Sequence, residues 1–472
     1  MTDTEAALVP YTDQECPRVR ILVVGKSGAG KSALINAVFG VAGATAVSHR
    51  TPGKHDINKP LSFPENDRII IHDSQGFEAG EEVNIEKVFE FIDSRSKMSA
   101  LADQLHAIWV CAEIPFAGSR LFEAGVEQLL TRYCGIFPIV VVFTKLDILR
   151  EKWLEKLEHE LGEEMNDKEF DDAVDAAVEV QVQKLCVEPL RAMSAENPLN
   201  WIATSTGLER RFKTTITDLI ELVLKLTNIE KMWIEMAIAQ RSNAKASIEA
   251  SIKIGRKRYW RGLLSDIFLG QTMRRVLGVL LTDIVNVWNM DDPENHLKKP
   301  EFLALLSVLV EDLSDEPRNN YELTDKAMQA IINNPASIIV AGPTAVVILF
   351  AEWVRGTYRK TKGSLRCLVA FLVDLTLTMD TLFYLVLSRK SSMTVGLVNQ
   401  ALRIYKTRKG PVHNSIKTWA DGWGVSSHLD AEVVIQKITD IIADNSIQPE
   451  LWEMKAESAD EAWMTVEALR ET

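Results

Sequence analysis

Eight consecutive residues near the start of the chain have the types and the spacing that bind a polyphosphate. They match the pattern G-x-x-x-x-G-K-S at every position, and they are Gly25, Lys26, Ser27, Gly28, Ala29, Gly30, Lys31 and Ser32. Glycines let a backbone approach phosphate oxygens closely, because no Cβ stands in the way. The ammonium of Lys31 is expected to reach the β- and γ-phosphates, and the hydroxyl of Ser32 to bind Mg²⁺. We therefore expect these residues and the following Ala33 to bind a nucleotide, with Lys31 also acting in catalysis.

The segments on either side of this loop have the patterns that a phosphate-binding loop needs. Residues 19–24 are apolar and mostly β-branched, which predicts a short buried strand. Residues 33–39 have helical spacing and are followed by Gly40, which is typical of a helix end. A strand, a glycine loop and a helix in this order place backbone N–H groups at a helix N-terminus, where they bind phosphate.

A second apolar run ends in residues that suit Mg²⁺ and the γ-phosphate. Residues 68–72 predict another strand, and an Asp-x-x-Gly sequence, Asp73 to Gly76, follows it. The carboxylate of Asp73 is expected to hold Mg²⁺ through water, and the N–H of Gly76 to bind the γ-phosphate during catalysis. The pattern is common by itself. Its position at the end of a strand, after a phosphate loop, makes it informative.

Two further motifs predict that the base of the nucleotide is guanine. Residues 137–143 predict a strand that leads into Thr-Lys-Leu-Asp at 144–147. The carboxylate of Asp147 can accept hydrogen bonds from N1–H and the exocyclic amine of guanine, a donor pair that adenine lacks. Residues 201–204 predict a last strand before Ser-Thr-Gly at 205–207, whose backbone is placed to meet the guanine O6. The residues expected to contact the nucleoside are Thr144, Lys145, Asp147, Ser205 and Thr206.

These four motifs resemble those of the translation-factor-related GTPases, in the branch that holds Era-like, septin-like and AIG1-like proteins. The resemblance extends over about residues 18–226. It implies an α/β P-loop GTPase domain with a mixed, mostly parallel sheet, which binds GTP at the C-terminal edge of that sheet. It also implies GTP as substrate, GDP as product and Mg²⁺ as cofactor. Relatives in this branch dimerise across the nucleotide face, so a homodimer is one expected partner.

Two positions depart from the patterns of related GTPases. Ras-like enzymes have a glutamine after the glycine of the Asp-x-x-Gly motif, and Phe77 occupies that position here. Phe77 cannot orient water by hydrogen bonding, so a backbone group, a residue in trans or the arginine of an activating protein must do so. We therefore expect slow hydrolysis without a partner. Gly28 stands where potassium-activated relatives have asparagine, so dependence on a monovalent cation is not expected.

The residue that closes over Mg²⁺ and the γ-phosphate has two candidates. Thr51 is the first, as a metal ligand and catalytic residue in the loop between the first helix and Asp73. Relatives with a T-P-G-x-T sequence use the second threonine, and that register places His55 there. The sequence favours Thr51 and leaves His55 as the alternative.

Composition limits the partners that the chain is expected to have. Its 53 basic and 66 acidic side chains give a net charge of −13 over 472 residues, so bulk attraction to nucleic acid is not expected. Residues 1–17 predict a disordered, polar tail with no apolar signal core. This pattern favours a cytoplasmic protein.

The remaining chain predicts helices. Residues 150–195 indicate an acidic helical insertion, which is either an extended helix with a solvated face or an element that binds a partner. From 227 to 472 we expect a compact α-helical domain. Within it, 229–256 predicts one helix, and Gly-Pro at 410–411 predicts a break after a helix over 393–408.

Two apolar segments within 336–388 admit two interpretations. Residues 336–351 carry no charge, and residues 367–387 carry only Asp374 and Asp380. A membrane hairpin is one interpretation, and it would make this region a site of membrane contact. The other is a buried helical bundle, because Asp374, Thr378 and Thr381 lie at helical spacing and predict a core helix with one solvated face.

These expectations leave two functions open. The first is a guanine-nucleotide switch that hydrolyses GTP slowly and changes the surface offered to its helical domain or to a second subunit. The second is a GTP-binding scaffold or membrane-associated structural protein with little turnover. Turnover that depends on protein concentration would favour the switch.

Overall fold

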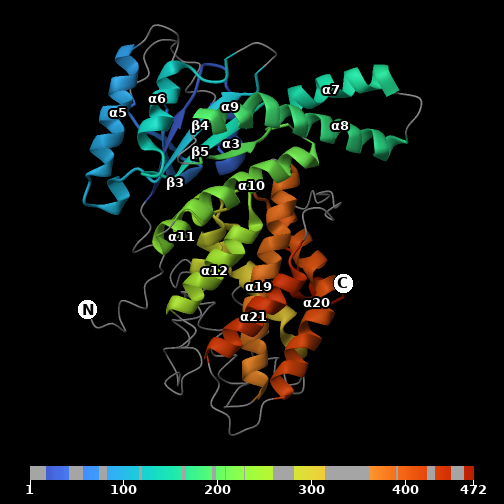
Figure 1. The fold of residues 1–472 in the computed structure, drawn as a ribbon. Helices are drawn as coiled ribbons and strands as arrows, with labels where there is room; N and C mark the ends of the chain where they lie inside the picture. Colours follow the sequence, from blue (N-terminus) through green and yellow to red (C-terminus); the bar gives the residue numbers. More distant parts are fainter. Residues whose placement is uncertain are drawn as a thin grey trace. The chain divides into compact units, whose positions relative to one another are not determined.

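The chain forms two compact units, one spanning Pro17–Asn243 and one that begins at Ala244 and runs to Thr472. The computed structural model describes residues 18–41, 57–73, 82–115, 120–161, 166–193, 198–207, 209–227, 229–258, 281–313, 362–389, 392–422, 431–447 and 462–471. Figure 1 draws both units as ribbons. The predicted tail, 1–17, lies outside the described residues.

A six-stranded sheet forms the centre of the first unit, in the order β2-β3-β1-β4-β5-β6. Its strands are β1 (Val19–Val24), β2 (Leu61–Phe63), β3 (Asn66–Asp73), β4 (Ala107–Glu113), β5 (Ile139–Thr144) and β6 (Asn200–Ala203). Neighbouring strands are parallel except β2 and β3, which are antiparallel. All six residues of β1 and of β5 are buried, as expected of strands covered on both faces. The expected mixed, mostly parallel α/β domain is confirmed.

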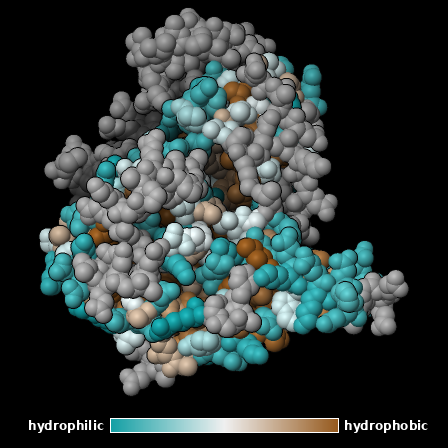
Figure 2. Space-filling model, turned by 90° about the horizontal axis from the view of Figure 1, so that it is seen from above, coloured by the Kyte–Doolittle hydropathy of each residue, from teal (hydrophilic) through white to brown (hydrophobic). Residues whose placement is uncertain are grey.

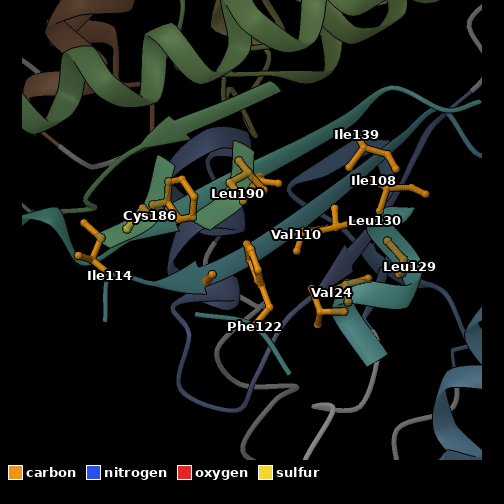
Figure 3. Packing of buried hydrophobic residues seen from close by; sticks show 14 of the residues in the cluster. Val24, Ile108, Val110, Ile114, Phe122, Leu129, Leu130, Ile139, Cys186 and Leu190 are labelled. Atoms are coloured by element: carbon orange, nitrogen blue, oxygen red, sulfur yellow. The ribbon is translucent and has the colours of Figure 1, made fainter. Parts of the chain in front are cut away.

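Helices pack around this sheet and supply its hydrophobic core. The helical elements of the unit are α3 (Lys31–Phe39), α5 (Glu82–Ser96), η1 (Leu101–Asp103), α6 (Ala124–Tyr133), α7 (Leu146–Leu161), α8 (Asp167–Val182), the π-helix η2 (Gln183–Val187), α9 (Glu188–Met193), α10 (Arg210–Leu226) and α11 (Glu230–Ala239). Figure 3 shows part of the core, with Leu129 and Leu130 of α6 and Leu190 of α9 on the sheet. Burying such side chains stabilises the unit by about 1.5–3 kcal/mol each.

The insertion expected over 150–195 lies in the hairpin of α7 and α8 and the turns that follow it (Figure 1). Asn166 begins α8 as its N-cap, because its side chain accepts a hydrogen bond from the Glu169 N–H at 3.0 Å. Val174, Val178 and Val182 recur at helical spacing and are buried, so one face of α8 packs on the unit.

The single helix expected over 229–256 is wrong, because the structure has two helices there. α11 ends at Ala239 and α12 begins at Ala244 and extends to Arg258. The side chain of Gln240 ends α11: its Oε1 accepts hydrogen bonds from the N–H groups of Ser242 and Asn243, at 2.8 and 2.7 Å.

This break coincides with the limit of the first unit, which lies at Asn243. α11 contacts β1 and β3. Asn66, at the start of β3, donates from its side-chain amide to the carbonyls of Phe39 and Ala239, both at 2.9 Å. Helix α11 therefore packs with the first unit, beyond the residue 226 at which the sequence suggests that this domain ends.

The second unit is helical wherever the structure describes regular elements in it, as the sequence predicts. Besides α12 and a helix over 281–288, its elements are η3 (His296–Lys298), α15 (Pro300–Leu309), η4 (Glu311–Leu313), α19 (Lys362–Arg389), α20 (Val395–Asp421), α21 (Ala431–Asn445) and α22 (Val466–Glu471). Helix α19 is central, because it packs against α12, α15, α20 and α21.

Helix α20 contradicts the expected break at residues 410–411, since it continues through Pro411. A proline inside a helix removes one N–H donor and crowds the preceding turn. The residues beyond it are nevertheless held in place, because Val412, His413 and Ile416 are buried and α20 packs along α19. Tertiary packing therefore outweighs the local preference of proline.

Within the described residues, the segment Val369–Ser388 of α19 is long and apolar enough to cross a membrane, judged by length and composition alone. In the structure, 89% of its apolar window is buried inside the unit. The expectation of one solvated face on this helix is wrong, because Asp374, Thr378 and Thr381 are all fully buried against neighbouring helices. The other apolar segment, 336–351, lies outside the described residues.

Candidate functional site

The phosphate-binding loop connects β1 to α3, and its conformation depends on glycine. Gly28 and Gly30 have φ values of 78° and 80°, in the left-handed region that L-residues other than glycine rarely adopt. Gly25 has a φ of 153°, and a Cβ built on it would lie 2.3 Å from the carbonyl oxygen of Cys111 on β4. These three glycines therefore let the loop pass close to β4 and turn into the helix.

The start of α3 presents donors and a cation to this loop. Gly30 is the N-cap of α3 and has no side chain to cap the helix, so its first-turn N–H groups are oriented for an anionic ligand. The ammonium of Lys31 donates to the carbonyl oxygens of Gly25 at 2.8 Å and Lys26 at 3.1 Å. This places the positive charge over the loop, where a β- or γ-phosphate would bind.

Asp73 lies beside the loop, as the sequence predicts for a residue that holds Mg²⁺. It ends β3, in register with Val23 on the parallel strand β1. Its carboxylate and the Lys31 ammonium both lie close enough to Cys111 to act on the thiol. Burial raises the pKa of Cys111 to about 12, Lys31 opposes the rise and Asp73 adds to it, so this thiol stays protonated and unreactive.

Ser32, in the first turn of α3, and Asp73 supply the oxygen ligands that Mg²⁺ prefers. The residues described here therefore fit a Mg²⁺-nucleotide, with a cradle for phosphate and two oxygen donors for the metal. Thr51, His55, Gly76 and Phe77 lie outside the described residues, so the structure does not choose between Thr51 and His55.

Thr144 connects the guanine motif to the phosphate loop. Its buried hydroxyl donates to the carbonyl of Ala29 in the loop at 2.9 Å and lies 3.3 Å from the carbonyl of Ala112 on β4. The sequence predicts that Thr144 contacts the nucleotide. In the structure its hydroxyl binds the backbone of the phosphate loop.

The next residues bring the groups that are expected to bind the base to the edge of the sheet. Lys145 has a φ of 64°, and its ammonium forms an ion pair with Glu113 at 2.7 Å. Asp147 lies half-buried in the first turn of α7. Glu113, at the end of β4, is missing from the sequence-based site, and the only signal for it is an acidic residue at a strand end.

A backbone hydrogen bond joins the two segments that are expected to recognise guanine. The N–H of Leu146 donates to the carbonyl of Thr204 at 3.2 Å. Ser205 is buried, and its hydroxyl accepts from the Gly207 N–H at 2.9 Å, which shapes the turn. Thr206 is exposed at this turn. The structure thus brings Thr144, Asp147 and Ser205 to one region, as the sequence predicts.

A cavity of about 220 Å³ adjoins the phosphate loop on the side of β4 and α6. Gly25, Lys26 and Ser27 line it from the loop, and Arg120 and Glu123 line it from the segment before α6. Lys26 lies 3.9 Å from the carboxylate of Glu123. No sequence pattern indicates this cavity, because its walls come from segments far apart in the chain.

Comparison with known families agrees with this geometry. Residues 20–144 match the family described as "50S ribosome-binding GTPase", a segment that includes the phosphate loop from its first glycine, Asp73 and Thr144. Residues 296–457 match the family described as "Domain of unknown function (DUF8505)". No curated protein matches the chain. The first match and the loop geometry together support GTP binding by a P-loop G domain.

Proposed function

We propose that this protein binds GTP with Mg²⁺, hydrolyses it slowly to GDP and phosphate, and changes its surface between the two states. One observation carries the proposal: the phosphate loop with Lys31, the strand-end Asp73 and the guanine motif at Asp147 belong to the same edge of one sheet. The family match over 20–144 supports the GTPase class. We extend that assignment to the Era-like, septin-like and AIG1-like branch on the motifs alone.

Each group at the site has a part in this reaction. Bound Mg²⁺ would neutralise charge on the β- and γ-phosphates. Ser32 and Asp73 would hold the metal, with Thr51 as the third protein group. The N–H groups of the loop and the Lys31 ammonium stabilise negative charge on the transferring phosphoryl group, because they are oriented before the reaction begins. The N–H of Gly76 would bind the γ-phosphate and release its segment after hydrolysis.

Slow turnover follows from the residue after Gly76. The side chain of Phe77 has no group that could orient water, so hydrolysis needs a hydrogen-bonding group from elsewhere. A second copy of the chain across the nucleotide face, or an activating protein with an arginine, would supply it. We therefore propose a cytoplasmic protein whose GTP state lasts until a partner binds.

One observation favours a second function. Helix α19 contains Val369–Ser388, which is apolar enough to span a membrane. A GTP-binding scaffold attached to a membrane through 336–388 is therefore the alternative, with little turnover of its own. The buried charges of α19 weigh against insertion, since a charged residue at the centre of a membrane costs about 2.5–3.5 kcal/mol.

The test is GTP hydrolysis by the full chain over a wide range of protein concentration. Lys31→Ala removes the phosphate-binding ammonium, and Lys97→Ala, at an exposed lysine of the same unit, is the matched control. Specific activity that rises with concentration and is lost only in Lys31→Ala supports the switch. GTP binding without turnover at any concentration, together with flotation on liposomes, would support the scaffold instead.

A further inference from the structure

The two segments that recognise guanine each lead into a helix. Asp147 lies in the first turn of α7, and residues 205–207 lie just before α10. The orientation of the Asp147 carboxylate toward a base held by 205–207 therefore depends on how α7 and α10 are held relative to each other. A displacement of about 1 Å is enough to weaken such a contact severely.

Four charged side chains join these two helices through α8, and we name them the α8 cluster: Arg150, Asp171, Asp175 and Arg211. Arg150 lies on α7, one turn after Asp147, and its Nε donates to Asp175 at 2.9 Å. It also donates to Asp171. Arg211, in the first turn of α10, donates to both oxygens of Asp175 at 2.9 and 3.0 Å and to Asp171 at 2.6 Å.

The geometry of the α8 cluster makes it stronger than ordinary surface ion pairs. The Arg150 side chain is only 8% exposed, so its guanidinium has lost water and depends on the two carboxylates. Each aspartate accepts from both arginines, which fixes the positions of all four groups. The hydrogen bond from Arg211 is the main cause that lowers the pKa of Asp171, so the Asp171 carboxylate is charged near neutral pH.

Helix α8, which carries the two aspartates of the α8 cluster, is not part of the motifs that are expected to bind the nucleotide. Helix α8 lies in the acidic segment between the two guanine motifs, in the hairpin that shows a largely hydrophilic surface (Figure 2). A segment longer than nucleotide binding requires is therefore attached, through two carboxylates, to the two helices that carry the base-binding groups.

We propose that the α8 cluster is a positioning device for guanine, in which Asp171 and Asp175 hold α7 and α10 so that Asp147 meets the base. The inference rests on the proposed function, because it concerns the same nucleotide site. It assigns to α8 a role in selectivity and in the lifetime of bound nucleotide. Loss of the cluster should weaken contacts to the base and leave the phosphate contacts of Lys31 in place.

The test compares GDP with inosine diphosphate, which lacks the exocyclic amine that Asp147 is expected to bind. The variant is Asp171→Asn with Asp175→Asn, which keeps side-chain shape and removes both charges. Asp172→Asn, at an exposed aspartate of the same helix, is the matched control. Dissociation constants and dissociation rates are measured for both nucleotides on the full chain, beside the melting temperature.

The wild type and Asp172→Asn are expected to prefer GDP. In the double variant GDP should bind about threefold to tenfold more weakly and dissociate faster, as expected for loss of a partly exposed charge network. The affinity for inosine diphosphate should fall less than the affinity for GDP. The dissociation constant of inosine diphosphate divided by that of GDP should therefore be smaller in the double variant than in the wild type. High salt should reduce GDP affinity more in the wild type than in the double variant.

An unchanged ratio in the double variant, with or without a lower melting temperature, would overturn the inference and leave the proposed function intact. If the double variant does not fold, Arg211→Gln is measured in its place and must show the same smaller ratio. Failure of the wild type to bind GDP in a manner that depends on Lys31 would overturn the proposed function, and this inference with it.

Discussion

One buried histidine in each unit, His106 in the first and His413 in the helical unit, is held in a different charge state. In the first unit His106 is neutral: its Nδ1 accepts from the Arg20 N–H at 2.7 Å, and its Nε2 donates to the carbonyl of Leu101 at 2.8 Å. Burial lowers the pKa of His106 to about 4, although the bond to Leu101 opposes the shift. The first unit therefore satisfies this buried ring with backbone groups and without charge.

In the helical unit His413 is a cation between two carboxylates. Its Nδ1 donates to Asp312 at 2.9 Å, and its Nε2 donates to Asp374 at 3.1 Å. Burial alone would lower the pKa of His413, but Asp374 and Asp312 outweigh it and raise that pKa to about 9. Asp374 also accepts from the hydroxyl of Tyr405 at 2.5 Å.

This difference distinguishes charged groups at the candidate ligand site from charged groups that are buried within the fold. The first unit places Lys31, Asp73 and Asp147 at the edge of its sheet, where a bound nucleotide can meet them. The helical unit buries Asp374 and His413 on α19 and α20, where they bind each other. Substitutions in the first set should change binding, and substitutions in the second should change stability.

Gly25→Ala should have the largest effect on the first unit. A Cβ at this position meets the Cys111 carbonyl at 2.3 Å, so the loop must move, and nucleotide affinity should fall by at least about 100-fold. Gly28→Ala is the control, because its Cβ meets nothing within 4 Å and only its φ of 78° resists the change. Nucleotide titration measures both. Equal losses would show that close approach to β4 is not what requires Gly25.

Asp374→Ala should have the largest effect on the helical unit. It leaves the His413 cation with one carboxylate and the buried Tyr405 hydroxyl without its acceptor, so unfolding free energy should fall by about 3–5 kcal/mol. Urea unfolding and hydrogen exchange along α19 measure the loss, and GTP affinity should stay as in the wild type.

A variant that replaces Asp374, His413 and Tyr405 together tests whether charge pairing explains this loss. Asp374→Leu, His413→Leu and Tyr405→Phe together should cost far less than Asp374→Ala, because no buried charge then lacks its partner. If the triple variant is as unstable as the single one, packing rather than charge pairing explains the loss.

The nucleotide unit was largely predictable because its signals are local. The loop, its flanking strand and the helix end at Gly40 follow from residue types a few positions apart, and the structure has all three. The positions of Thr144 and Glu113 relative to the loop depend on which strands are neighbours, and no local pattern contains that information. The same holds for the α8 cluster, whose members come from three helices.

The helical unit was less predictable because its polar residues have no motif. The spacing of Asp374 and Thr378 indicates a polar stripe, and an isolated helix would expose such a stripe to water. In the structure the stripe is buried, since His413 and Tyr405, about thirty to forty positions later, supply partners for Asp374. The break predicted at Pro411 was wrong for a related reason. Packing of α20 on α19 stabilises a helix that proline would interrupt locally.

Stability should depend on pH with opposite sign in the two units. His413 binds a proton more tightly when folded, so its contribution is full below about pH 6.5 and is lost as the pH rises through about 9. His106 binds a proton less tightly when folded. Its contribution to stability is therefore full above about pH 6.5 and is lost as the pH falls toward about 4. Each histidine should contribute up to about 3 kcal/mol.

Hydrogen exchange of α19 and of β4, measured from acid to alkaline pH, separates the two effects. His413→Gln should reduce the loss of α19 stability at alkaline pH. His106→Gln should reduce the loss of β4 stability at acid pH. If α19 is most stable at alkaline pH, His413 is not held as a cation by its carboxylates.

Asp380 gives the smallest expected effect and tests the comparison directly. Within the described residues, no cation contacts this buried carboxyl group of the helical unit. Its Oδ2 accepts from the Ile447 N–H at 2.7 Å, and its buried Oδ1 has no hydrogen-bond partner within the described part of the chain. Burial raises the pKa of Asp380 to about 7, against the effects of Ile447 and Arg408.

The contribution of Asp380 is therefore full below about pH 4 and is lost as the pH rises through about 7. Asp380→Asn can still accept from Ile447 and carries no charge, so it should raise unfolding free energy by about 2 kcal/mol near pH 8 and change little near pH 4. Asp374→Asn is the control and should lower the unfolding free energy near pH 8, because the Asp374 carboxylate is paired with His413. If Asp380→Asn destabilises the protein at both pH values, then the helical unit needs this carboxylate charged, and internal pairing is not what distinguishes its charges from those of the nucleotide site.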